Sequence, residues 1–359
     1  MNRENWIKVD KKAFCEGDFS DIESLLNIFR WKPKNSLKRY NFFIDELPKK
    51  IENKENFINL SAINKTQIIE QYKAAYISGK NVNYKYSVLK QENYSEKEFS
   101  IEQAIRFFST PVSLLLENGR NDSYFLKAIF KYFDKEISNK NRLLEFYKND
   151  WIRFENAGGW TNVGNFIEGM KTSLESFCSD EGRDSKDFIR CFVLMDSDKE
   201  YPEDIPSSKI ELQKKLEAWG IEVHILKKRA MENYMPDEVI NNEGERINAI
   251  SAWVDVYKHL ANEQKDYLNY NKGFPKDQGK KRPRNLQHID IANLYSNPPI
   301  SDANYDVLDR GMKYPNFKED FPKNFESPFS FKTALLKREG GTNESNEFND
   351  IINKINKLL

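Results

Sequence analysis

Residues 190–200 have the sequence RCFVLMDSDKE, and this stretch decides the predicted fold. The run from Arg190 to Met195, apolar after its first residue, predicts a short buried strand, and an acidic D-S-D segment follows it directly. Similar runs lie on both sides: the predicted strands are 112–116, 151–156, 190–195 and 221–226, and the predicted helices lie near 125–133, 161–177 and 207–219. Strands that alternate with helices in this way predict an α/β fold, with a mostly parallel sheet flanked by helices.

The helix at 207–219 has recognisable ends in the sequence. Ser207 or Ser208 is expected to cap its N-terminus, and Gly220 is expected to end it after Trp219.

The patterning divides the chain into three regions. Residues 1–105 form an N-terminal accessory domain, with an alternating strand at 82–88 and a helix near 68–77. Residues 106–240 hold the alternating strands and helices. Residues 241–359 are mainly helical, with a Gly- and Pro-containing basic loop at 271–284 and an amphipathic helix at the end.

Four acidic residues follow predicted strands. Glu117 comes directly after 112–116, Asp196 and Asp198 come directly after 190–195, and Glu232 lies a little beyond 221–226. In open α/β sheets, ligands bind at the carboxyl ends of the strands. Carboxylates gathered there repel one another unless a cation lies among them, and oxygen ligands suit Mg²⁺ or Mn²⁺. We therefore expect a divalent-metal site at this edge of the sheet.

The D-S-D spacing supports this expectation if the segment is extended. Residues i and i+2 of an extended chain point the same way, so Asp196 and Asp198 would converge on one site. The alternative is a solvated strand-to-helix loop, in which Asp and Ser are common turn residues.

Two groups of basic residues are candidates for phosphate contacts. Lys227, Lys228 and Arg229 follow the strand at 221–226, where Lys227 or Lys228 would stabilise charge that develops in a transition state. The loop from Lys272 to Arg284 holds six basic residues and one acidic residue, and includes Phe274. We expect four of its residues to follow a nucleic-acid backbone: Lys280, Lys281, Arg282 and Arg284. A solvated charge run remains the alternative for both groups.

Gly158 and Gly159 precede Trp160 and follow the strand at 151–156. A pair of glycines lets the backbone turn tightly and approach a phosphate closely, and an ordinary strand-to-helix turn is the equal alternative.

The overall composition excludes several classes of protein. Of 359 residues, 39% are hydrophobic, and 56 basic residues balance 56 acidic ones, which excludes a uniformly basic nucleic-acid coat. Three cysteines without paired spacing indicate a reducing compartment, and three separated histidines disfavour a zinc site. With no run of 18 apolar residues, we expect a cytoplasmic protein that does not enter a membrane. No GxxxxGK[ST] segment occurs, so we expect no nucleotide-hydrolysing motor in this chain.

Four segments together resemble a TOPRIM domain: LLLENGRNDSYFLKAI, ENAGGW, FVLMDSDKE and HILKKRAMENYMP. Topoisomerases, bacterial primases, small maturation ribonucleases and OLD-family nucleases share that fold. The resemblance spans about residues 110–240, and KKRAMENYMP is most similar to the defence-associated branch of OLD-like and AriB-type proteins. It implies that Glu117 is the glutamate after the first strand, that Asp196 and Asp198 are the DxD metal ligands, and that Glu232 is the late acidic residue.

One departure from the family pattern is visible. The family has Glu-Gly-x-x-Asp, whereas this chain has one residue more between Glu117 and Asp122. Asp122 is therefore either a further ligand or the cap of the helix that begins there.

The resemblance implies a metal-dependent endonuclease that cleaves DNA or RNA with Mg²⁺ or Mn²⁺. It also implies an anti-phage effector that works with a separate ATPase subunit, and homo-oligomerisation is left open. Two alternatives remain: a nucleic-acid-binding or regulatory module that keeps the fold without catalysis, and a nucleotide-sugar transferase that uses the DxD. A HAD-type phosphatase fits less well, because Lys199 and Glu200 follow Asp198 in place of Gly-Thr.

Overall fold

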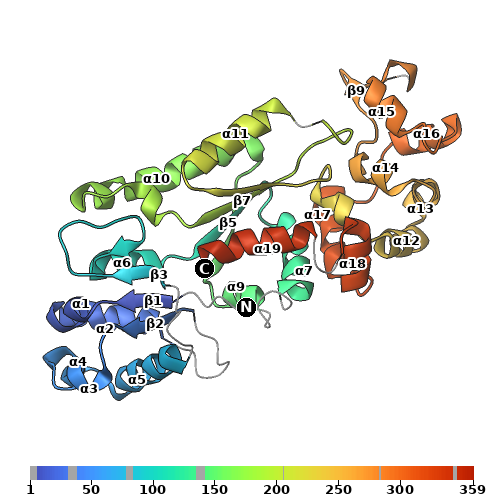
Figure 1. Cartoon of the computed structure of the whole chain (residues 1–359). Coiled ribbons are helices and arrows are strands. Elements are labelled where there is room, and N and C mark those ends of the chain that lie inside the picture. The colour runs from blue at the N-terminus through green and yellow to red at the C-terminus, as the bar shows by residue number, and fades with distance from the viewer. Residues whose placement is uncertain are drawn as a thin grey trace.

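The chain folds into two parallel β-sheets with helices around them and a helical region at one end (Figure 1). The computed structural model describes residues 6–30, 39–77, 84–134, 142–204, 206–282, 284–342 and 346–359. Within these ranges, no helix is both long and apolar enough to cross a membrane.

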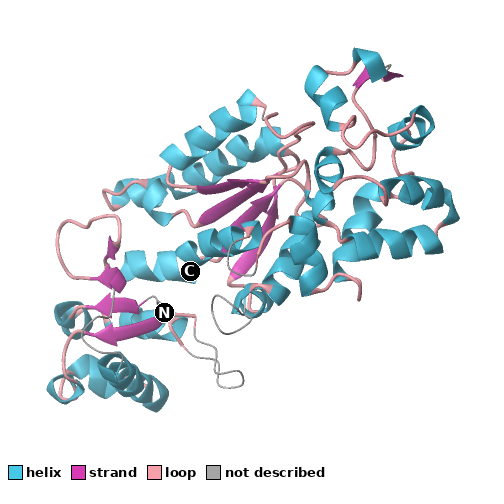
Figure 2. Ribbon diagram, turned by 45° about the vertical axis from the view of Figure 1, so that its right-hand side comes forward, coloured by secondary structure: helices cyan, strands magenta, loops and turns pink. Residues whose placement is uncertain are grey.

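The central sheet has four parallel strands in the order β6-β5-β7-β8. They are β5 (Val112–Leu116), β6 (Ile152–Asn156), β7 (Cys191–Met195) and β8 (Glu222–Ile225). All four strands were expected from the apolar runs, and their ends differ from the predicted ones by at most one residue. The predicted α/β architecture with a parallel sheet flanked by helices is confirmed (Figure 2).

Helices cover both faces of the central sheet. Leu115 and Val193 point toward α10 (Val163–Asp180) and α11 (Ser207–Ala218), and they share a core cluster with Ile167 and Leu216. The alternate residues, such as Leu116, pack with α7 (Asp122–Tyr132) and α19 (Glu347–Leu358) in the larger core. Two further short elements lie near this sheet: α9 (Arg142–Lys148) and the 3-10 helix η1 (Trp160–Asn162).

The predicted serine cap of α11 is wrong. Pro206 occupies the N-cap position, and no side chain makes a capping hydrogen bond there. Gly220 follows the helix with a positive φ of 78°, a conformation that glycine adopts without strain.

The N-terminal region is a second parallel sheet, in the order β2-β1-β3-β4. Its strands are β1 (Trp6–Val9), β2 (Asn41–Ile44), β3 (Tyr84–Val88) and β4 (Glu98–Phe99). Its helices are α1 (Lys11–Glu16), α2 (Phe19–Ile28), α3 (Pro48–Ile51), α4 (Glu55–Asn59), α5 (Ala62–Ile77) and α6 (Ile101–Ser109). The predicted strand at 82–88 appears as β3, although Val82 itself lies outside the described residues.

The first predicted boundary falls inside α6. Phe107 and Phe108 of that helix belong to the N-terminal core, and the chain enters the central sheet just after Pro111. Cys178, and Phe188 of the 3-10 helix η2 (Ser185–Phe188), also join this N-terminal core. The two sheets are therefore packed together through the end of α10 and the segment that follows it.

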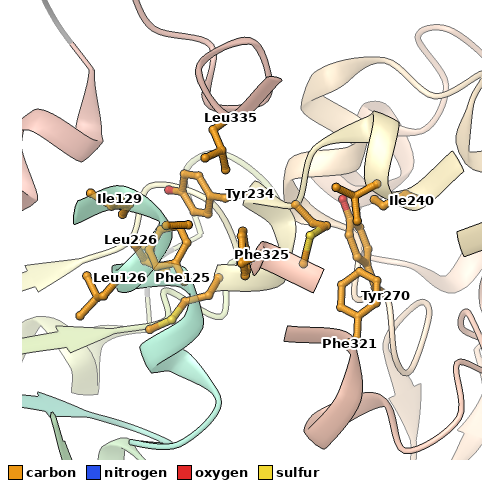
Figure 3. Close-up of a cluster of buried hydrophobic side chains, with 14 of the residues drawn as sticks. Phe125, Leu126, Ile129, Leu226, Tyr234, Ile240, Tyr270, Phe321, Phe325 and Leu335 are labelled. Carbon is orange, nitrogen blue, oxygen red and sulfur yellow. The ribbon is translucent and has the colours of Figure 1, made fainter. Parts of the chain in front are cut away.

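The C-terminal region shares one core with the central sheet. Its elements are α12 (Asp237–Arg246), α13 (Asn248–Tyr257), α14 (Asn262–Tyr267), β9 (Lys276–Asp277), β10 (Lys280–Lys281), α15 (Ile289–Leu294), α16 (Asp302–Asp309), α17 (Phe317–Asp320) and α18 (Lys332–Glu339), with the 3-10 helices η3 (Met231–Tyr234), η4 (Arg284–Leu286) and η5 (Phe321–Glu326). Figure 3 shows Phe125 of α7 against Tyr234 and Phe325, with Leu335 of α18 close by. The boundary predicted at residue 240 lies inside α12, so no separate core begins there.

Candidate functional site

The structure brings the acidic residues together at the carboxyl edge of the central sheet. Glu117 follows β5, Asp196 and Asp198 follow β7, and Glu232 lies in η3 beyond β8. Burial raises the pKa of Asp196 well above its ordinary value, and the negative charges of Glu232, Glu117, Asp122 and Asp198 raise it further. These carboxylates are therefore close enough to oppose one another's ionisation.

Two backbone hydrogen bonds fix the inner pair. The amide of Asp196 donates to Glu117 Oε1 at 3.1 Å, and the amide of Met231 donates to Asp196 Oδ1 at 3.0 Å. The second bond joins the DxD segment directly to the turn that carries Glu232.

The D-S-D segment is not extended, so the expected i, i+2 convergence does not hold in that form. Asp198 has a φ of +58°, and its side chain is 48% exposed, whereas Asp196 turns inward. Two hydrogen bonds attach this loop to the segment after β8. Ser197 Oγ donates to the carbonyl of Lys228 at 2.7 Å, and the Asp198 amide donates to the carbonyl of Arg229 at 2.9 Å. The negative charge of Asp198 still contributes to raising the pKa of both Glu117 and Glu232.

Lys209 lies among these carboxylates, and the sequence analysis missed it. Its side chain is 1% exposed, and its Nζ donates to Asp198 Oδ2 and, at 2.7 Å, to the carbonyl of Asp196. Glu117 Oε1 is 3.5 Å from the same nitrogen. A cation in the first turn of a helix opposes the helix dipole unless an anion lies nearby, and this was the available clue in the sequence.

Asp122 is a fifth carboxylate beside the cluster. Burial and the negative charges of Glu232 and Glu117 raise its pKa to about 8. A hydrogen bond from the Asn118 amide acts in the opposite direction. Its Oδ2 accepts the Asn118 amide at 2.7 Å and so closes the turn that contains the additional residue. Asn121 occupies the N-cap position of α7, so Asp122 is not the cap.

The glycine turn positions Glu117. The amide of Gly159 donates to the carbonyl of Glu117 at 3.0 Å, and Asn156 Oδ1 accepts from the amides of Gly119 and Gly158, each at 3.1 Å. Gly158 and Gly159 have φ values of +75° and +112°, which favour glycine. Because the chain itself uses these amides, the geometry favours the strand-to-helix turn over phosphate binding.

The turn with Glu232 is held from behind. The amide nitrogen of the Asn233 side chain donates to the carbonyls of Lys265 and Leu268 at 2.8 and 2.9 Å. The hydroxyl of Tyr234 donates to Glu347 of α19, and its ring is fully buried, so this tyrosine cannot stack on a base. Burial raises the pKa of Glu232, and the nearby Lys318 of α17 partly offsets that effect.

Lys227 and Lys228 do not join the carboxylates. The Nζ of Lys228 is buried and donates to Asp266 Oδ1 at 2.6 Å and to the carbonyl of Arg338 at 2.8 Å. Burial and the charge of Arg338 lower its pKa to about 8. Lys227 has an exposed side chain at the strand end. The charge-stabilising role predicted for Lys228 therefore has no geometric support, and Lys209 is the lysine that contacts the carboxylates.

The predicted basic loop is a short hairpin, β9 and β10, whose cations are largely paired. Lys281 pairs with Asp306, Arg282 pairs with Asp277, and Arg284 donates to the carbonyl of Ile300 at 2.8 Å, whereas the Lys280 side chain is exposed. Phe274 does not face solvent as a base-stacking residue would: it is buried and stacked on Tyr305, with ring centroids 4.2 Å apart.

The donor set fits Mg²⁺ or Mn²⁺, since all five acidic side chains offer oxygen. Among the described residues, however, no three acidic, histidine or cysteine side chains are arranged as a ready ligand group. Lys209 offsets part of the negative charge at this edge of the sheet through its contacts with Glu117 and Asp198.

Comparison with known proteins finds no matching family model, no matching curated protein and no matching solved structure.

Proposed function

We propose that this chain is a divalent-metal-dependent nuclease of the TOPRIM type, which hydrolyses phosphodiester bonds of DNA or RNA. The observation that carries the proposal is the gathering of Glu117, Asp196, Asp198 and Glu232 at one sheet edge, joined by the two amide hydrogen bonds to Glu117 and Asp196 and by the contacts of Lys209. Burying several carboxylates together costs free energy that a structural role alone would not require. Such strained acidic clusters are typical of functional sites.

Each residue has a distinct part in the proposed site. Glu117, Asp196, Asp198 and Glu232 hold the metal, with Asp122 beside them. Mg²⁺ or Mn²⁺, when bound, supplies activation of the attacking water and stabilisation of the leaving oxygen. Lys209, which now pairs with Asp198, would offer its positive charge to the scissile phosphate. The amide of Gly159 holds the backbone of Glu117, and the amide of Met231 holds the carboxylate of Asp196.

The biological setting remains part of the proposal. The resemblance of KKRAMENYMP to the OLD-like branch supports an anti-phage effector that acts in the cytoplasm with a separate ATPase subunit. The transferase alternative leaves Glu117 and Glu232 without a role, although both oppose the ionisation of Asp196.

A binding module without catalysis is the second candidate. The ion pair between Lys209 and Asp198 favours it, because that pair already balances charge without a metal. Metal-dependent cleavage separates the two candidates.

The test is cleavage of labelled single-stranded and double-stranded DNA and RNA with Mg²⁺, with Mn²⁺ and with EDTA. Wild-type protein should cleave at least one substrate only when a metal is present. Asp196→Asn should slow cleavage roughly a hundredfold or more, because a lost ligand weakens both the metal and the charge stabilisation it provides.

The matched control is Asp255→Asn, which changes an exposed carboxylate of α13 that pairs only with Lys258 among the ion pairs of the described chain. It should leave the rate unchanged. Full activity of a folded Asp196→Asn protein would exclude the proposed site, and metal-dependent binding without cleavage would favour the second candidate.

A further inference from the structure

Two aromatic rings from distant parts of the chain stack beside the candidate site. Tyr201 and His288 have ring centroids 5.0 Å apart and ring planes only 7° from parallel. Tyr201 follows Asp198 by three residues, so its Cα lies within about 11 Å of that aspartate. That distance corresponds to about three stacked base steps of 3.4 Å.

The pair is open to solvent on the histidine side. The side chain of His288 is 51% exposed, although its Nδ1 accepts from the Asp290 amide at 3.3 Å, so half of its surface is open to another group. Two apolar neighbours in the same segment are also exposed, Leu286 at 64% and Ile289 at 69%. Exposed apolar and aromatic groups gathered in one segment indicate a contact surface.

The basic hairpin lies next to this surface. Arg229 lies 3.8 Å from the carboxylate of Glu200, the residue before Tyr201, and the carbonyl of Arg282 accepts a 3.3 Å hydrogen bond from the side chain of Gln287, the residue before His288. Lys281 and Arg282 come from β10 and its end, where they pair with Asp306 and Asp277, and a phosphate would compete for these pairs, whereas Lys280 is exposed. Cations around free aromatic surface are the combination that binds single-stranded nucleic acid, where phosphates follow the cations and bases stack on the rings.

We propose that the Tyr201–His288 pair is a stacking platform for an unpaired base, and that the strand presented to the carboxylate site is single-stranded. This inference rests on the proposed nuclease function and adds its substrate class. A base within a duplex is stacked on its neighbours and has no free face for His288, whereas an unpaired base does. The π-face and the phosphate are common to DNA and RNA.

The experiment measures binding in EDTA, where no metal-dependent cleavage occurs. The probes are an unstructured fluorescein-labelled 16-nucleotide DNA, the RNA of the same sequence, and the duplex of each, followed by fluorescence anisotropy. At least one single strand should bind about tenfold more tightly than its duplex. His288→Ala should weaken that binding by about fivefold or more, the loss expected for one stacked base.

Three variants complete the design. His288→Phe keeps an aromatic face and should retain binding, which separates stacking from the charge of the histidine. Ile289→Glu places a negative charge on the same surface without touching the core, and it should weaken binding of the single strand. His259→Ala removes another exposed histidine, on the segment after α13, and should have no effect.

The outcomes separate this inference from the proposed function. Equal affinity for duplex and single strand, or unchanged binding by both His288→Ala and Ile289→Glu, overturns the platform even if the protein cleaves nucleic acid. Single-strand preference that His288→Ala removes supports the platform even if no cleavage is ever found, in which case the nuclease proposal alone fails.

Discussion

Lys209 is the residue whose position says most about the carboxyl edge of the sheet. Its buried ammonium lies against Glu117 and Asp198 and so offsets part of the negative charge of the acidic groups at this edge. Removing the charge of a buried lysine leaves its carboxylate partners without compensation. This loss lowers the stability of the protein more than the loss of an exposed ion pair does.

We therefore predict that Lys209→Met lowers the free energy of unfolding by about 2 kcal/mol or more without added metal. Millimolar Mg²⁺ should restore most of this loss, because the metal then provides the missing charge and binds only the folded state. Thermal unfolding with and without Mg²⁺ measures both effects.

Lys214→Met is the control, because Lys214 is an exposed lysine on the same helix. It should change neither the stability nor the response to Mg²⁺. A Lys209→Met protein as stable as wild type, with the same small response to metal, would contradict the role assigned to this lysine.

Sequence patterns could predict the acidic residues but not this lysine. Glu117, Asp196 and Asp198 directly follow apolar runs, so their common edge follows from parallel topology alone. Lys209 reaches the edge from a helix in which it is one of several basic residues. Its place in the first turn, against the helix dipole, is a local hint, but whether it turns inward depends on the angle at which α11 packs, which the local sequence does not encode.

At the scale of elements, the C-terminal helix α19 positions the turn that carries Glu232. Glu347, in its first turn, accepts the amide of Lys227 at 2.8 Å and the hydroxyl of Tyr234, and its Oε1 lies 2.8 Å from Nε2 of His224. Burial alone would raise the pKa of Glu347, but the hydrogen bonds from His224, Tyr234 and Lys227 lower it overall. One carboxylate thus joins α19 to the end of β8 and to η3.

The lowered pKa gives a pH dependence of definite sign. A carboxyl group with a lower pKa in the folded state stabilises the protein fully above its ordinary pKa of 4.5, and this contribution is lost as the pH falls through the folded value. We predict that Glu347→Gln costs about 1–3 kcal/mol at pH 7, and that the difference from wild type shrinks below about pH 4.5.

Urea unfolding between pH 3.5 and 7.5 measures this dependence. Glu222→Gln is the control, since Glu222 makes a partly exposed pair with Lys357 on the same strand and helix, and such pairs contribute little. A Glu347→Gln deficit that stays constant down to pH 3.5 would show that the ionised carboxylate is not what stabilises the turn.

The strands of the two sheets were not equally predictable. In the central sheet, β5 and β7 are nearly continuous apolar runs, as expected for strands covered on both faces, and the patterns locate all four strands within one residue. The strands β1 and β2 have four residues each, and the partners Trp6 and Asn41 are far apart in the sequence. Parallel pairing of this kind leaves no local turn signal, so the N-terminal sheet could not be derived.

At the scale of the whole molecule, Arg190 joins the two sheets and the last helix. It is buried, and its guanidinium donates to the carbonyl of Leu358 at 2.7 and 3.1 Å, to the hydroxyl of Tyr40 at 2.6 Å and to the carbonyl of Thr110 at 3.4 Å. Arg39 reinforces this junction with a 2.7 Å bond to the same Thr110 carbonyl. Composition does not show such a junction, because its partners are mainly backbone carbonyls.

Arg190→Met should therefore loosen the N-terminal sheet from the central one without dissolving either core. The methionine fills much of the volume but leaves the carbonyl of Leu358 and the hydroxyl of Tyr40 without their donor, at a cost of about 3 kcal/mol or more. Hydrogen exchange should rise in α6 and in β1–β3, while β5 and β7 stay protected.

The control Arg153→Met removes an arginine of β6 that pairs with Asp150 at the surface, and it should leave exchange unchanged. If Arg190→Met raises exchange equally in both sheets, the molecule unfolds as one unit and Arg190 supports its global stability. If exchange in α6 is unchanged, the apolar contacts of Phe107 and Phe188 hold the two sheets together without Arg190.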